Sequence, residues 1–179
     1  MSGGNWKPIL VAAVAAFAAL AGSADAPSSP TRPATSLDAL SHDVLIDVNA
    51  VRKSHGLAPV RLSVSLTAAA AQHSNEMARV GYFAHESADG AAFDKRLAHF
   101  YPMGRRHYWS VGENLVWAAP DLDAAAALEL WMNSPPHRHN LLTSRWREIG
   151  ISAVHADAAP GSYGGGPATI ITTDFGVRR

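Results

Sequence analysis

The sequence contains no cysteine among its 179 residues. This absence excludes a disulfide framework, a cysteine-ligated zinc or iron–sulfur site, a thiol nucleophile and an acylated lipoprotein cysteine. A domain of about 150 residues buries roughly 70% of the surface that its unfolded chain exposes. We therefore expect one domain that is held together by its core alone.

The chain also lacks an excess of charge of either sign, because 15 Lys and Arg residues match 15 Asp and Glu residues. A balanced net charge argues against a broad nucleic-acid-binding face and against a polybasic membrane patch. No nucleic-acid partner is therefore expected. The composition is notable instead for nine histidines, all of which follow residue 26.

The one apolar run near the N-terminus, residues 9–21, is too short for a transmembrane helix. At ~1.5 Å per residue it falls short of a hydrocarbon core of ~30 Å. It follows the single charge of Lys7 and precedes Ala24-Asp25-Ala26, which fits the small-x-small cleavage rule. This order predicts a signal peptide over residues 1–26, rather than a membrane anchor, and secretion to the periplasm or the extracellular space. No transmembrane segment is expected after cleavage.

Residues 27–36 are rich in proline and serine and predict an extended linker, so the folded domain is expected over residues 37–179. Apolar residues then recur at steps of three and four in several segments, which indicates helices, and the period later changes to two, which indicates strands. Helices are predicted from Ser36 to Gly56, from Ser63 or Ser65 to Gly81, from Phe93 to Phe100, and from Asp121 or Asp123 to the pair Pro135-Pro136. Strands are predicted over Gly112–Trp117, Glu148–His155 and Thr169–Phe175, the last two forming an antiparallel hairpin across a glycine-rich loop. The predicted helices lie mostly in the first part of the domain and the strands in the last part, which favours an α+β or layered fold.

Three short stretches place side chains with acid, base or metal-binding chemistry at the ends of these elements. His85 follows two aromatic residues just after a helix, where it either stays partly solvated or bonds a loop carbonyl. Glu113 begins an apolar strand, so its carboxylate is either exposed at the strand end or paired with a cation, a histidine or backbone donors. His137 and His139 are two residues apart, and in a helical turn only one of them can enter a shared site.

Common catalytic and nucleotide-binding motifs are missing from the chain. It has no His-Glu-x-x-His pair, no P-loop, no Gly-x-Ser-x-Gly elbow and no Gly-x-Gly-x-x-Gly turn. Serines, histidines and acids are present, but nothing marks a nucleophile. The residues alone therefore indicate a site without indicating a reaction.

Taken in order, the stretches resemble the bacterial branch of the CAP (SCP-like) superfamily, which also contains the cysteine-rich secretory proteins, antigen 5 and the plant pathogenesis-related 1 proteins. The resemblance runs from about residue 40 to residue 176. Its motifs are the segment 45–60, Phe83-Ala-His-Glu-Ser, Gly112-Glu-Asn-Leu, Trp131-Met-Asn-Ser-Pro-Pro-His, Glu148-Ile-Gly-Ile and Asp174-Phe-Gly. It implies a three-layer α-β-α sandwich with a central, mostly antiparallel sheet and a broad surface cleft.

The resemblance also implies a site. Two histidines and two acids converge in the cleft of such proteins, and some members bind a divalent metal there, often zinc. Three of these positions fall on His85, Glu113 and His137. Animal and plant members carry a glutamate three residues after the tryptophan, where this chain has Ser134, so Glu148 is the expected fourth member.

The expected function is that of a secreted protein whose cleft binds a divalent metal together with a small-molecule, lipid or protein ligand. The resemblance carries no generally established reaction. One alternative is a metal-dependent extracellular hydrolase of peptides or cell-wall material, with Glu113 as general base. Another is a purely structural adhesion module.

Overall fold

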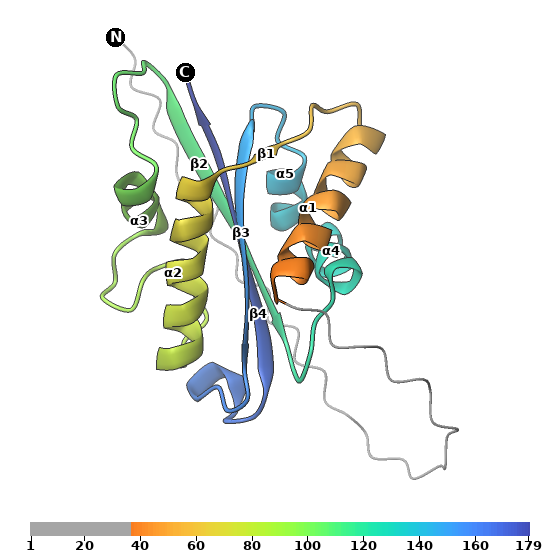
Figure 1. Cartoon of the computed structure of the whole chain (residues 1–179), viewed down its shortest axis with the longest axis vertical. Helices are drawn as coiled ribbons and strands as arrows, with labels where there is room; N and C mark the ends of the chain where they lie inside the picture. The colour runs from red at the N-terminus through yellow and green to blue at the C-terminus, as the bar shows by residue number, and fades with distance from the viewer. Residues whose placement is uncertain (1–36) are drawn as a thin grey trace.

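The computed structural model describes residues 37–179, which form a sheet between two layers of helices (Figure 1). The predicted signal peptide, the predicted linker and the cap expected at Ser36 lie outside the described residues. In chain order the elements are α1 (Leu37–Ser54), β1 (Arg61–Leu62), α2 (Val64–Val80), α3 (Phe93–Phe100), β2 (Trp109–Ala118), α4 (Ala124–Asn133), α5 (Pro135–Leu141), β3 (Glu148–Ala156), the 3₁₀ turn η1 (Gly161–Tyr163) and β4 (Ala168–Arg178).

The sheet has the strand order β1-β3-β4-β2. The short strand β1 runs parallel to β3, and the other two pairs are antiparallel. Strands β3 and β4 form the expected hairpin, in which Glu148 lies opposite Gly176 and Ala156 opposite Ala168. β2 is an edge strand that pairs with β4 along its whole length.

Helices α2 and α3 cover one face of the sheet, and α1, α4 and α5 cover the other (Figure 1). The larger core, between the sheet and α1, α4 and α5, is centred on Trp131, Trp146 and Phe175. On the other face, Leu66, Leu97 and Tyr101 pack beneath α2 and α3. This arrangement confirms the three-layer α-β-α sandwich. No helix within residues 37–179 is long and apolar enough to cross a membrane.

The helix ends follow the capping residues seen in the sequence. The Ser63 hydroxyl accepts a hydrogen bond from the Leu66 amide at the start of α2, and the Asp123 carboxylate accepts one from the Ala126 amide at the start of α4. Gly81 ends α2 in the left-handed region with φ +88. This conformation suits glycine because it has no Cβ.

The sequence predicted neither α5 nor β1, nor the 3₁₀ turn η1 within the glycine-rich loop. Pro135 and Pro136 were expected only to stop a helix, and they do end α4, but they also begin α5. Proline suits the first turn of a helix because the amide hydrogens there have no partner within the helix. Strand β1 has two residues, too few to show a pattern with a period of two.

Gly150 allows α2 to approach the middle of the sheet. A Cβ at this position would lie 2.0 Å from the backbone carbonyl carbon of Leu66 and 2.2 Å from the amide nitrogen of Thr67. Both contacts are with backbone, which cannot move aside as a side chain does. The absence of a side chain at residue 150 therefore sets the distance between α2 and β3.

We expect Gly150→Ala to destabilise the fold by about 3 kcal/mol, because overpacking forces the backbone of α2 away from the sheet. The matched control is Gly166→Ala, since a Cβ at Gly166 would meet no atom within 4 Å and its φ needs no glycine. Urea unfolding of both variants and the parent measures the difference. Equal stability of the two variants would contradict this account of the close contact.

Candidate functional site

A cavity of about 490 Å³ lies along the edge strand β2. His85 and Phe93 line it from the α3 layer, and His137 and Asn140 line it from α5. Glu113 on β2 also lines the cavity. The structure therefore brings three of the four expected site residues, His85, Glu113 and His137, to one cavity.

Glu113 is paired within the protein rather than exposed at the strand end. Its side chain is completely buried, Oε1 accepts a hydrogen bond of 2.8 Å from Nδ1–H of His85, and Oε2 accepts one from the guanidinium of Arg96. Burial by itself would raise the pKa of Glu113, but the hydrogen bond from His85 and the positive charge of Arg96 outweigh it and lower that pKa. The carboxylate is therefore ionised at neutral pH.

Arg96 also holds the loop that carries His85. Its Nη1 donates to the backbone carbonyl of His85 over 3.2 Å and to the hydroxyl of Ser87 over 3.0 Å. Arg96 thus holds two groups in place: the carboxylate of Glu113 and the backbone of His85. A carboxylate behind an imidazole selects the tautomer with a proton on Nδ1 and leaves Nε2 as the unprotonated nitrogen.

His73 supports this group from α2. It is fully buried, its Nε2 lies 2.9 Å from the carbonyl oxygen of Ala84 and 4.0 Å from Oε1 of Glu113. Burial is the main cause that lowers the pKa of His73, so the ring is neutral at pH 7. His73 is therefore a core residue of α2.

Asp174 is a second buried acid, directly opposite Glu113 in the pairing of β2 with β4. Within residues 37–179, neither of its carboxyl oxygens has a hydrogen-bond partner. Burial raises the pKa of Asp174 well above its ordinary value, and the negative charge of Glu113 raises it further. Asp174 thus favours the neutral, protonated form, whereas Glu113 favours the ionised form.

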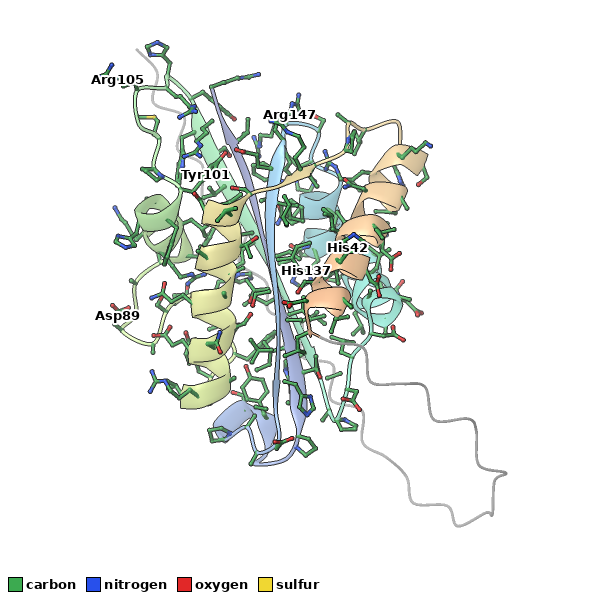
Figure 2. The ribbon with its side chains drawn as sticks, in the orientation of Figure 1. His42, Asp89, Tyr101, Arg105, His137 and Arg147 are labelled. Carbon is green, nitrogen blue, oxygen red and sulfur yellow. The ribbon has the colours of Figure 1, made fainter. Side chains whose placement is uncertain are left out.

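His137 enters the cavity from the opposite layer (Figure 2). Its Nδ1 is 2.8 Å from the hydroxyl of Ser134, the residue that stands where animal and plant relatives were expected to have glutamate. Asn114 on β2 donates to the carbonyl of His137 over 3.1 Å, and Asn140 donates to Asn114 over 3.0 Å. These bonds attach α5 to the same strand that carries Glu113.

His139 also lines the cavity, but it is exposed, whereas His137 is buried. The prediction that only one of the two would enter a shared site was therefore wrong for the lining, although only His137 is buried there.

Glu148 lies away from the cavity. It begins β3, accepts a hydrogen bond from the hydroxyl of Tyr101, and is absent from the lining. The full strand β4 separates β3 from β2. The structure therefore does not bring Glu148 together with His85, Glu113 and His137.

The donor set limits what kind of metal ion fits this cavity. Among residues 37–179, no group of three or more His, Cys, Asp or Glu side chains is arranged to hold a metal ion. Both oxygens of Glu113 bond protein partners, and Nδ1 of each histidine does too. His85 and His137 are thus the two imidazoles that line the cavity, and Glu113 and Ser134 lie behind them and orient the rings.

Sequence reasoning missed Arg96 and Asp174. The requirement that an inward carboxylate be paired pointed to a cation, but nothing in the sequence distinguished Arg96 from its neighbour Lys95. The spacing of apolar residues along Phe93–Phe100 was the available signal, because it places Arg96 and Leu97 on the buried side of α3.

Comparison with known proteins agrees with the motifs. A family model described as the Cysteine-rich secretory protein family, CAP, matches residues 45–171. The membrane protein YlbC of Bacillus subtilis is 30% identical over 116 residues, which cover 64% of this chain and 32% of that protein. YkwD of the same organism is 29% identical over 123 residues, which cover 68% of this chain and 45% of that protein. The matched region thus spans less than half of the length of these curated relatives.

Solved structures share the fold. An extracellular protein containing an SCP domain from Bacillus anthracis superposes with a TM-score of 0.62 at 24% identity, over 87% of this chain and 45% of that one. An outer surface protein from Borrelia burgdorferi gives a TM-score of 0.63 at 16% identity, over 77% of this chain and 94% of that one. At such identities the likeness concerns the arrangement of helices and strands.

We expect Arg96→Met to destabilise the protein by about 4 kcal/mol at pH 7, because it leaves the buried charge of Glu113 without its cation. The folded state lowers the pKa of Glu113, so the stability that this carboxylate contributes is present above its unfolded pKa and is lost as the pH falls. The difference between parent and variant should therefore shrink below about pH 4. Urea unfolding across this pH range measures it.

Lys95→Met is the matched control for that experiment, because Lys95 is the exposed neighbour on the same helix, and its effect should stay within about 0.5 kcal/mol. A double variant Arg96→Met, Glu113→Gln should regain part of the lost stability. If the double variant is no more stable than Arg96→Met, the charge of Glu113 is not the cause of the loss.

Asp174→Asn should become more stable relative to the parent as the pH rises. The folded state raises the pKa of Asp174, so its contribution is fully present below the unfolded value of about 3.9 and is lost as the pH rises toward the folded value. Asparagine cannot ionise and does not lose this contribution. Unfolding free energies at pH 4 and pH 8 test the trend, with the exposed Asp89→Asn as control; a difference from the parent that is the same at both pH values would contradict it.

Proposed function

Because the chain belongs to the Cysteine-rich secretory protein (CAP) family, to which the sequence motifs had pointed, we propose that it is an exported binding domain. In this proposal the cavity along β2 takes a small-molecule, lipid or protein ligand together with a divalent cation, zinc being the first candidate, held by His85 and His137. One observation carries the proposal. The two histidines come from opposite layers, line the same cavity, and each has Nδ1 in a hydrogen bond with a polar side chain.

The hydrogen bonds suit two imidazoles that act as ligands. The carboxylate behind Nδ1 of His85 fixes the ring orientation and favours the neutral tautomer whose Nε2 can bind a cation, and the Ser134 hydroxyl, which can donate or accept, fixes the orientation of the His137 ring. A divalent ion held by two imidazoles would keep open coordination positions and supply Lewis acidity to whatever occupies the cavity. Glu113 and Ser134 contribute by orientation, and Asn114 keeps α5 against β2.

The cavity itself suits a small organic ligand or one segment of a larger one. Its volume of about 490 Å³ lies in the usual range for ligand sites, roughly 300–1,000 Å³. Its lining combines aromatic side chains with polar and charged ones. The aromatic members are Phe93, Tyr108, Trp109 and Trp146. Aromatic walls provide apolar contact area, and the polar groups fix the orientation of a ligand.

The hydrolase alternative has less support in this geometry. A general base needs a carboxylate oxygen that can reach a proton on water or substrate. Both oxygens of Glu113 already accept hydrogen bonds, from His85 and Arg96, and its lowered pKa makes it a weak base. Glu113 fits the role of a positioning residue that orients His85.

Export is the second part of the proposal. It rests on the charged, apolar and small-residue order of residues 1–26 and on the extracellular description of the related protein from Bacillus anthracis. A domain without cysteine can fold in either an oxidising or a reducing compartment, so its fold does not depend on disulfide formation.

We expect calorimetric titration of the chelator-treated protein with zinc to show binding at one site. His85→Ala and His137→Ala should each weaken it at least about tenfold, since each removes one of two ligands. The control is His42→Ala, because His42 is exposed on α1 and does not line the cavity. No binding by the parent protein, or undiminished binding by both cavity variants, would refute the metal site.

The same titration should show weaker binding at pH 5 than at pH 7.5. Imidazole must be deprotonated to bind a metal ion, and an ordinary imidazole with a pKa of ~6.5 is about 3% deprotonated at pH 5. With one or two imidazole ligands the expected loss is more than about thirtyfold. Equal affinity at the two pH values would mean that histidines do not hold the ion.

A further inference from the structure

Exposed or half-exposed arginines gather at one end of the sheet, where β1 and β3 begin and β4 ends. Figure 2 labels two of them, Arg105 and Arg147, and Figure 1 shows the C-terminus at the same end. We call this set the arginine row. It consists of Arg61, Arg105, Arg106, Arg147, Arg178 and Arg179.

Backbone hydrogen bonds show that the row crosses the sheet strand by strand. The amide of Arg61 donates to the carbonyl of Arg147 over 3.0 Å, and the amide of Arg147 donates to the carbonyl of Gly176 over 3.1 Å. The amide of His107 donates to the carbonyl of Arg179 over 2.9 Å. Neighbouring strands lie about 4.8 Å apart, so the row extends at least about 14 Å across the end of the sheet.

Acidic residues are concentrated at the opposite end of the strands. Asp121, Asp123 and Asp157 are exposed and follow the ends of β2 and β3. At the arginine end the sheet carries Glu148, whose carboxylate accepts a hydrogen bond from Tyr101. The balanced net charge of the chain therefore conceals a separation of charge along the strands.

Several guanidinium groups of the row are held in place before any partner binds. Arg147 donates to the carbonyl of Ser144 over 2.8 Å, and Arg178 donates to the carbonyl of Pro102 over 3.1 Å. The Arg178 guanidinium also lies 3.9 Å from the ring centre of Tyr101. Preorganised guanidinium groups bind phosphate or sulfate oxygens in pairs and lose little side-chain freedom when they do.

The surroundings of the row indicate which anion it suits. Nucleic-acid strands bind such surfaces by stacking bases on open aromatic faces. Here Arg178 lies over Tyr101, and Arg179 lies 5.0 Å from the ring centre of Tyr108, so the protein's own guanidinium groups cover these rings. The exposed apolar residues near the row are Leu62 and Val64, which follow Arg61 in the chain, and Met103, which lies before β2 at the other side of the sheet.

We propose that the arginine row is a docking surface for a linear polyanion with repeated phosphate groups and no bases, of the kind that an exported protein meets at a cell surface. A group of cations along the end of a sheet attracts a chain of anions, and each phosphate bound releases counterions. The row lies outside the lining of the cavity that holds His85 and His137, so binding there is separate from the proposed metal site.

Inorganic polyphosphate carrying a fluorescent label is the probe, titrated with the protein at several NaCl concentrations. The test variant is Arg61→Gln, Arg105→Gln, Arg106→Gln, whose three side chains are exposed. We expect at least about tenfold weaker binding at 50 mM NaCl, and a salt slope that is smaller by about 2, for three lost phosphate contacts. The control is Arg79→Gln, Lys95→Gln, Arg138→Gln, which removes the same charge from exposed positions on α2, α3 and α5.

Circular dichroism and zinc titration of each variant establish that the fold and the cavity are intact. Single-stranded DNA of equal charge and vesicles containing anionic lipid are the competing partners, and both should bind more weakly than polyphosphate. Absence of polyphosphate binding by the parent, equal losses in the test and control variants, or tighter binding of DNA or vesicles would each overturn the proposal.

Discussion

The buried negative charge of Glu113 is the constraint on which the rest of the site depends. An ionised carboxylate in the interior costs several kcal/mol unless it is paired and hydrogen-bonded. This cost is offset by a hydrogen bond from His85 to one oxygen of Glu113 and by one from Arg96 to the other. Those partners come from the loop after α2 and from α3. A single charge on an edge strand therefore holds a loop, a helix and a histidine ring in fixed relation to the sheet.

The neighbouring acid is tolerated because it stays neutral. Two ionised carboxylates on adjacent strands would repel each other, and burial already disfavours the charge on Asp174. One carboxyl group is thus stabilised as an anion and the other as an acid, although both lie in the same buried layer. The difference arises from Arg96 and His85, which bond Glu113.

The cavity forms where two separately packed layers meet across β2. His85 belongs to the layer of α2 and α3, whereas His137 belongs to the layer of α1, α4 and α5. Asn114 and Glu113 are consecutive residues of β2, so their side chains point to opposite faces of the sheet. Asn114 bonds the backbone of His137 and Glu113 bonds the ring of His85. Glu113 and Asn114 thereby position one histidine on each face of the sheet.

Much of this arrangement could be predicted from the sequence, and the reason differs from residue to residue. The helix that ends at Gly81 has clear periodicity and caps, the helix over Phe93–Phe100 has periodicity alone, and the structure confirms both. His85, Glu113 and His137 could be picked because each lies in a short motif at the end of an element. Arg96 and Asp174 could not be picked as site residues, because their roles depend on contacts between elements that are distant in the sequence. Glu148 shares a motif position with related proteins, but strand order places β4 between it and β2.

Strand β1 is so short that most of β3 has no neighbouring strand on its outer side. An open strand edge is a template on which another chain can add a strand, and this is a common route to aggregation. Here the hydroxyl of Ser41 on α1 accepts a hydrogen bond from the amide of Ala153 over 3.2 Å, and the amide of Ser63 donates to Ile149 over 2.8 Å. Helix α1 and the start of α2 thus occupy backbone groups that a second molecule would need. Helix α1 therefore covers part of the outer edge of β3 in addition to packing against the core.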